Sequence, residues 1–98
     1  MLNSKIKSKE ADFLFRAILS LQDMDECYQF FEDLCTVTEI KAMAQRIVVA
    51  KMLSEKQVYS KIVEQTGAST ATISRVSRSL EYGCDAYAMV FERMNGGK

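Results

Sequence analysis

Residues 66–80 carry the side chains of this sequence that are best suited to a chemical task. The stretch reads TGASTATISRVSRSL and has no acidic residue, although the whole chain holds 13 acidic and 13 basic residues. Arginine can form two hydrogen bonds to a guanine edge or to a phosphate, and serine and threonine can bond to either. The composition of this stretch therefore indicates contact with a polyanion such as DNA.

A helix over residues 70–80 would separate these side chains onto two faces. At about 100° per residue, Ile73, Val76 and Leu80 fall on the inner side. We expect the DNA contacts on the outer face, on its flanks and at the helix start: Ser69, Thr70, Ala71, Thr72, Ser74, Arg75 and Arg78. An ordinary solvated helix is the alternative, but serine and threonine each cost up to about 0.7 kcal/mol relative to alanine. Their number in one helix favours a binding role.

Two short helices joined by a tight turn would position this outer face. A first helix is expected over residues 57–65. Its inward residues would be Val58, Ile62 and Val63. Gly67 suits the left-handed position that closes a helix, and Ser69 suits the cap that opens the next one. Residues 57–80 thus predict a helix-turn-helix, whose second helix enters the major groove of DNA.

The remaining sequence predicts further helices on both sides of this motif. Apolar periodicity marks one helix over residues 10–21, and Asp23 or Asp25 would cap the next. The run Thr36-Val-Thr-Glu39 has the capping-box spacing and would open a long helix to about residue 53. A last helix is expected after Gly83. The sequence therefore predicts an all-α protein of six helices.

These outer helices are too apolar for a lone chain of 98 residues, which has little interior in which to bury them. An obligate homodimer with a shared core would resolve this, whereas a compact monomer with exposed aromatic residues is the alternative. We therefore expect one domain, residues 1–98, in which residues 10–53 and 83–94 form dimerisation helices. Residues 1–9, with three lysines, would form a mobile arm.

The composition argues against several other classes of protein. The chain has no histidine, the commonest general base and metal ligand, and no motif with catalytic spacing. Its three cysteines form no CxxC pair, and no apolar run is long enough for a signal peptide or a membrane span. We therefore expect a cytoplasmic protein that is not an enzyme and that binds neither metal nor membrane.

At this point the chain resembles the tryptophan repressor family, in particular its Gram-positive branch of repressor-like proteins. The resemblance lies in Leu34-Cys-Thr-Val-Thr-Glu39, Ala44-Gln-Arg-Ile47, Gly67-Ala-Ser-Thr-Ala-Thr-Ile-Ser-Arg75 and Ser77-Arg-Ser-Leu80. It implies an intertwined, all-helical homodimer with two DNA-binding heads. These heads would be spaced for successive major grooves of a palindromic operator, about 34–36 Å apart. It also implies a transcriptional repressor of an amino-acid-related operon.

The resemblance further implies a pocket for a free amino-acid corepressor between the core and the helix-turn-helix. Thr36 and Arg75 would hold its carboxylate, Ser79 its ammonium group, and Arg46 and Arg75 would enclose its side chain. A salt bridge from Arg46 to Glu39 or Glu64 is the alternative for that arginine. The family's tryptophan binders have glycine after the second arginine, where this chain has Val76. Since valine would fill the space of an indole, we expect a corepressor other than tryptophan, or none.

Two rival functions are left by the sequence. A helical protein–protein interaction module could use the same face and would fit the net charge of zero. A replication-initiator type of head has a similar helix-turn-helix, but it normally accompanies a nucleotide-binding domain, and no phosphate-binding glycine loop is present. Binding to DNA should weaken steeply with salt, which would separate it from the first rival.

Overall fold

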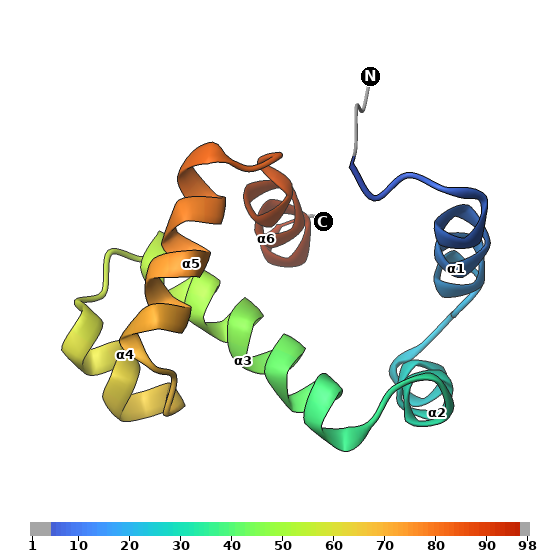
Figure 1. Ribbon diagram of the computed structural model, residues 1–98, viewed down its shortest axis with the longest axis horizontal. Coiled ribbons are helices and arrows are strands. Elements are labelled where there is room, and N and C mark those ends of the chain that lie inside the picture. Colours follow the sequence, from blue (N-terminus) through green and yellow to red (C-terminus); the bar gives the residue numbers. More distant parts are fainter. Residues whose placement is uncertain (1–4, 97–98) are drawn as a thin grey trace. The chain divides into compact units, whose positions relative to one another are not determined.

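The computed structural model describes residues 5–96, and the regular elements among them are all α-helices. In chain order they are α1 (Lys9–Leu19), α2 (Met24–Leu34), α3 (Val37–Ser54), α4 (Tyr59–Thr66), α5 (Thr70–Tyr82) and α6 (Ala86–Asn95) (Figure 1). The predicted class and the predicted number of helices are confirmed. The helix ends differ from the predicted ends by at most three residues, most at α6, where residues 83–85 belong to the turn.

The chain divides into two compact units, an N-terminal unit up to Val37 and a C-terminal unit from Thr38. The arm predicted over residues 1–9 lies partly outside the described residues. Within them, α1 already begins at Lys9, because the Ser8 hydroxyl caps it by accepting a hydrogen bond from the N–H of Ala11 at 2.9 Å.

Helix α2 is capped at its start by a reciprocal pair of hydrogen bonds. The Asp23 carboxylate accepts from the N–H of Glu26 at 2.9 Å, and the Glu26 carboxylate accepts from the N–H of Gln22 at 2.8 Å. Of the two aspartates that the sequence offered, Asp23 is therefore the cap. This arrangement satisfies backbone donors that the first turn of a helix leaves without partners.

The two helices of the N-terminal unit have no buried residue. Both are amphipathic, yet large side chains such as Phe13, Leu19 and Met24 are well exposed, and Leu19 retains 82% of its accessible surface. Helices of 11 residues are marginal in water unless an apolar face is covered. The N-terminal unit therefore needs a further surface to pack against.

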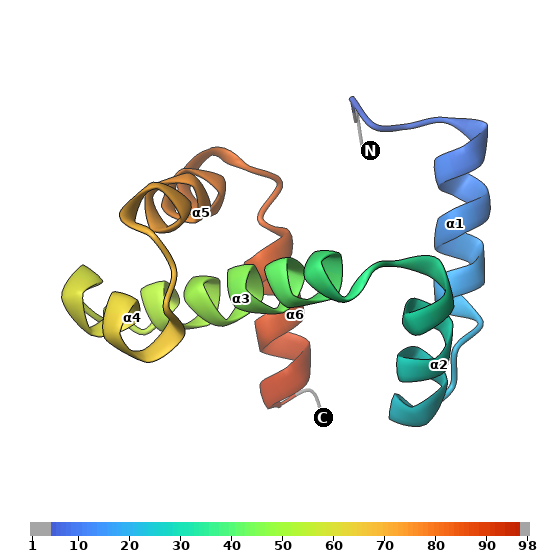
Figure 2. The ribbon, with the colours of Figure 1, turned by 60° about the horizontal axis from the view of Figure 1, so that its bottom comes forward.

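The C-terminal unit contains the hydrophobic core. Figures 1 and 2 both show α4 and α5 at the end of the long helix α3 that leads into them. The core takes residues from α3, α4, the turn, α5 and α6: Val49, Ala50, Met52, Ile62, Ala68, Ile73, Val76 and Phe91. Helix α6 is also held on α3 by the Lys51 ammonium, which lies 5.2 Å from the centre of the Phe91 ring.

The inward face predicted for the first helix of the motif is partly wrong. Ile62 is fully buried, as expected, but Val58 is 64% exposed and Val63 is 36% exposed. Val58 precedes α4 instead of lying within it, so it does not share the helical periodicity. Helix α4 has eight residues, and it turns a narrow stripe centred on Ile62 toward the core.

Candidate nucleic-acid interface

The turn between α4 and α5 is built as the sequence predicts. Gly67 closes α4 in the left-handed conformation, with φ of 74°, and its N–H donates to the carbonyl of Val63 at 2.9 Å. A Cβ atom on Gly67 would meet nothing within 4 Å. Glycine is therefore required here for its backbone conformation and not for lack of space.

Helix α5 begins with the predicted cap. The Ser69 hydroxyl accepts from the N–H of Thr72 at 3.1 Å, and the two hydroxyl groups are hydrogen-bonded at 3.1 Å. Ala68, between the glycine and the cap, is buried in the core and fixes the turn against the helices. The turn therefore sets both the start of α5 and its rotation.

The predicted rotation of α5 agrees with the burial of its residues. Ile73 is 0% exposed, Val76 is 2% exposed, and Leu80 packs against the same core. The opposite face is open to solvent. Its exposed residues are Ser69, Thr70, Ala71, Ser74, Arg75 and Arg78, and Thr72 is half-buried beside them. That these side chains contact DNA remains a prediction.

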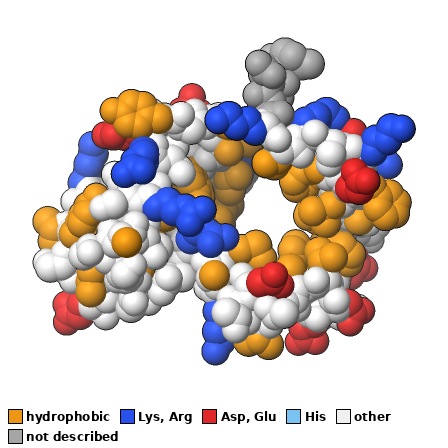
Figure 3. All heavy atoms as spheres, in the orientation of Figure 1, with side chains coloured by type: hydrophobic (Ala, Val, Ile, Leu, Met, Phe, Trp, Pro, Cys, Tyr) orange, Lys and Arg blue, Asp and Glu red, His pale blue; other side chains and the backbone are white. Residues whose placement is uncertain are grey.

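The arginines of this face form no salt bridge among the described residues, although Glu81 follows Arg78 by three positions on α5. The salt bridges of residues 5–96 join Lys7 to Asp12 and Lys51 to Glu55, and neither involves an arginine of α5. The first turn of α5 has no acidic residue. Figure 3 shows basic side chains gathered over α5. An oxyanion could therefore approach Arg75 and Arg78 without first breaking a salt bridge.

A shallow hollow of about 270 Å³ lies at the second half of α5. It is lined by Arg75, Arg78, Ser79, Tyr82 and Gly83. Tyr82, which is 80% exposed, was missed by the sequence reasoning. It lies seven residues after Arg75 and hence on the same helical face, so extending the helical pattern by one turn would have found it.

The structure brings together only part of the predicted amino-acid pocket. Arg75 and Ser79 share the hollow, and Val76 lies in the hydrophobic core as a fully packed residue. Arg46 is half-buried on α3 and does not line the hollow. The described residues form no salt bridge with Arg46, so the predicted pairing with a glutamate is not seen among them. Thr36 belongs to the N-terminal unit.

A contact that the sequence reasoning missed joins α3 to the helix-turn-helix. The Gln45 side-chain amide donates to the main-chain carbonyl of Thr66 at 3.1 Å. The two residues are 21 positions apart. Neither hydrophobic periodicity nor a local motif signals a hydrogen bond over that separation, so it could be found only in three dimensions.

Residues 5–96 hold no candidate membrane span and no candidate metal cluster. No helix there is long and apolar enough to cross a membrane. No group of three or more histidine, cysteine, aspartate or glutamate residues is arranged to hold a metal ion.

Comparison with known proteins decides the family. The sequence profile of the family described as "Trp repressor protein" matches residues 9–95, which span all six helices. The chain belongs to the Trp repressor family. Members of the Trp repressor family are DNA-binding regulators of transcription and not enzymes, and membership indicates the same general role for this chain.

Individual relatives agree with this assignment. The chain is 59% identical over 90 residues to YerC, an uncharacterized protein of Bacillus subtilis strain 168, covering 92% of this chain and 86% of YerC. A crystal structure of a candidate Trp repressor from Staphylococcus aureus matches with a TM-score of 0.90 and 55% identity, over 93% and 91% of the two chains. A TrpR-like protein from Eubacterium eligens ATCC 27750 matches with a TM-score of 0.91 and 58% identity, over 96% and 97%.

Proposed function

We propose that the protein is a sequence-specific transcriptional repressor that binds a palindromic operator as a homodimer and regulates an amino-acid-related operon. The observation that carries the proposal is the outer face of α5. There, Arg75 and Arg78 lie exposed and without acidic partners among short hydroxyl side chains. Arginine and hydroxyl groups on one helical face can bond to base edges and phosphates in the major groove.

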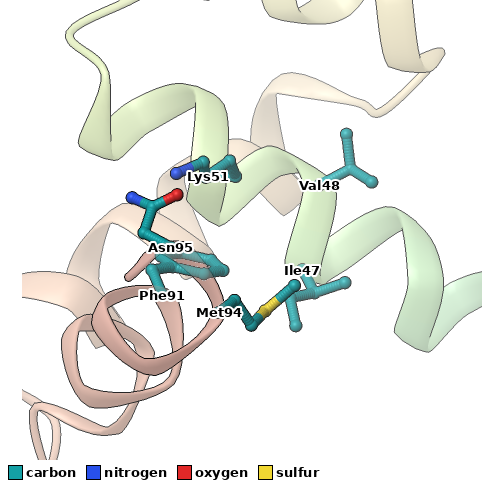
Figure 4. A pocket seen from close by; sticks show the side chains of 6 residues that line it. All are labelled: Ile47, Val48, Lys51, Phe91, Met94 and Asn95. Carbon is teal, nitrogen blue, oxygen red and sulfur yellow. The ribbon is translucent and has the colours of Figure 1, made fainter. Parts of the chain in front are cut away.

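The unburied apolar surface supports the homodimer. Helices α1 and α2 bury no residue, and a groove of about 310 Å³ lies open in the C-terminal unit. It is lined by Ile47, Val48, Lys51, Phe91, Met94 and Asn95. Figure 4 shows the side chains of Ile47 and Met94 close together beside Phe91. A second copy of the chain would cover such surfaces and would also supply the second DNA-binding head.

The first experiment asks whether the protein selects and binds DNA. Double-stranded sites are selected from a random pool, and binding of the purified protein to them is measured by fluorescence anisotropy at low and high salt. We expect a palindromic site with half-sites about one helical turn apart. The affinity should fall by about 0.9 decades per decade of salt for each phosphate contacted.

Two outcomes would contradict this function. The absence of any selected sequence would favour the protein–protein interaction module, because that role needs no duplex. Binding that does not respond to salt would also contradict it, since contacts to phosphate release counterions.

For the ligand, we propose a free amino acid other than tryptophan, or no ligand at all. Val76 supports this because its side chain is packed in the core at the position where a tryptophan-binding member has glycine. Arg75 and Ser79 in the hollow could still hold the carboxylate and the ammonium group of an amino acid with a smaller side chain.

A thermal-shift panel of all twenty amino acids tests the ligand. We expect no rise in melting temperature with tryptophan. Any amino acid that does stabilise the protein should lose its effect in the Arg75→Ala variant, because a ligand stabilises only the folded form that binds it. A rise of several degrees with tryptophan would show that Val76 leaves room for an indole.

A further inference from the structure

The hydrogen bond from Gln45 to Thr66 joins the long helix α3 to the end of α4, next to the turn of the helix-turn-helix. Gln45 is half-buried on α3, the longest helix, and Thr66 is the last residue of α4, directly before the turn. Among the side-chain hydrogen bonds described for residues 5–96, this one links α3 to the helix-turn-helix. It therefore connects the scaffold to the motif at the point where the chain changes direction.

Thr66 transmits this contact to both sides of the turn. Its hydroxyl donates to the carbonyl of Ile62 at 2.7 Å and accepts from the N–H of Ala68 at 3.1 Å. The next residue, Gly67, has a defined left-handed conformation. A displacement of the Thr66 carbonyl would hence move the end of α4, the turn and the cap of α5 together.

The hydrophobic core that α3 shares with the motif is a different kind of connection. It includes Ala50 of α3 and Ile62 and Ile73 of the motif. Apolar contacts are not directional and tolerate small rotations, whereas a hydrogen bond weakens steeply when its angle changes. The Gln45 amide thus restricts the angle of the motif in a way that the core alone does not.

We propose that Gln45 is a positioning residue that fixes the angle of the helix-turn-helix relative to α3, and with it the half-site spacing at which the protein binds its operator. The proposal rests on the proposed DNA-binding function and deepens it. A direct bond from scaffold to motif restricts this angle within the folded chain.

The test compares Gln45→Leu with the wild-type protein on the selected operator. Leucine has a similar size but no donor. The matched control is Gln65→Leu, an exposed glutamine of α4 beside Thr66. Gln45→Lys is the rescue variant, because its ammonium group can donate to the same carbonyl. Gln45→Glu serves as a second variant without a donor if the leucine variant does not fold.

The main readout is the preference for operator spacing, measured on operators with one base pair added or removed between the half-sites. We expect the wild-type protein to favour the natural spacing, and this preference to fall about fivefold in Gln45→Leu, the factor that about 1 kcal/mol for one hydrogen bond corresponds to. Gln45→Lys should restore most of it. A purely stabilising role would weaken binding to all spacings equally.

A second readout needs no DNA. Amide hydrogen exchange at residues 66–70 should become faster in Gln45→Leu and stay unchanged in Gln65→Leu, with little change in the rest of α3. This readout distinguishes a failure of the positioning proposal from a failure of the proposed DNA-binding function. If the wild-type protein selects no DNA, the proposed function fails, and the exchange rates still show whether Gln45 holds the turn.

Two results would overturn the positioning role. One is a Gln45→Leu variant that keeps both the wild-type spacing preference and the wild-type exchange rates. The other is a Gln45→Leu variant that weakens binding to all operator spacings equally and leaves the exchange rates at residues 66–70 unchanged.

Discussion

Arg75 and Arg78 lie three residues apart on α5 and line the same hollow. Their surroundings are similar, but the roles that we expect of them differ. Arg75 is followed by the buried Val76 and shares the hollow with Ser79, whereas Arg78 lies one turn further along the exposed face. The proposed pocket includes Arg75 but not Arg78. Substituting each arginine should hence separate DNA contact from ligand contact.

Arg78→Ala should weaken operator binding and leave any amino-acid response unchanged. The expected loss is about 1–3 kcal/mol if the guanidinium contacts a base, and it should be largest for the selected sequence. Anisotropy titrations on selected and scrambled sites would measure it, with Lys56→Ala, between α3 and α4, as the matched loss of one exposed charge. Unchanged affinity in Arg78→Ala would mean that the outer face of α5 does not meet the duplex.

Arg75→Ala should reduce both operator binding and the thermal response to an amino acid. The loss of both follows if one guanidinium serves two anionic partners, a phosphate or base edge and a ligand carboxylate. Operator binding would be measured by fluorescence anisotropy, and the response to an amino acid by the shift in melting temperature. If an amino acid still stabilises Arg75→Ala fully, the hollow is not its binding site.

The exposed and buried residues of α5 could be predicted from the sequence, whereas those of α4 could be predicted only in part. The outward and inward residues of α5 could be predicted because a helix imposes a fixed rotation once one apolar residue is placed. Val58 and Val63 were misplaced because α4 is short and begins later than its apolar pattern. The contact of Gln45 with Thr66 depends on how α3 packs on the motif, which no local pattern encodes.

Two glycines end helices of the motif for different physical reasons. Gly67 has φ of 74° and open space around its α-carbon. Gly83 has an ordinary φ of −87°, but a Cβ atom there would lie 2.4 Å from the carbonyl oxygen of Ser79. The first position requires glycine for its backbone conformation, the second for lack of space.

Gly67→Val should therefore destabilise the fold by about 1–2 kcal/mol, because a side chain disfavours the left-handed conformation. Gly67→Asn should cost less, since asparagine adopts that conformation more readily. Urea unfolding followed by circular dichroism would compare the three proteins. Equal losses for valine and asparagine would show that space, and not backbone conformation, decides this position.

The helices themselves were predictable because caps and apolar spacing are local signals, and each helix of residues 5–96 carries at least one of them. The assembly was predictable only in outline. Excess apolar surface indicates that a partner is needed, but the sequence does not show which surfaces meet. The absence of any buried residue in α1 and α2 now locates that need in the N-terminal unit.

Leu19→Lys should impair assembly, whereas Val58→Lys should not. Both residues are well exposed in the single chain, so a monomeric protein would tolerate both changes equally. If a second copy covers α1, only the lysine at position 19 would have to be buried without a partner. Sedimentation equilibrium and the dependence of melting temperature on protein concentration would measure the effect. Equal behaviour of the two variants would favour a monomer.

The lack of buried residues in α1 and α2 also affects how the activity of such a regulator depends on its concentration. If these helices pack against a second copy of the chain, folding of residues 5–37 becomes a second-order process. Halving the number of molecules would then cut the concentration of the folded dimer by more than half. At low concentration, chains would remain partly folded and exposed to proteolysis, so any regulatory effect would set in over a narrow range of expression.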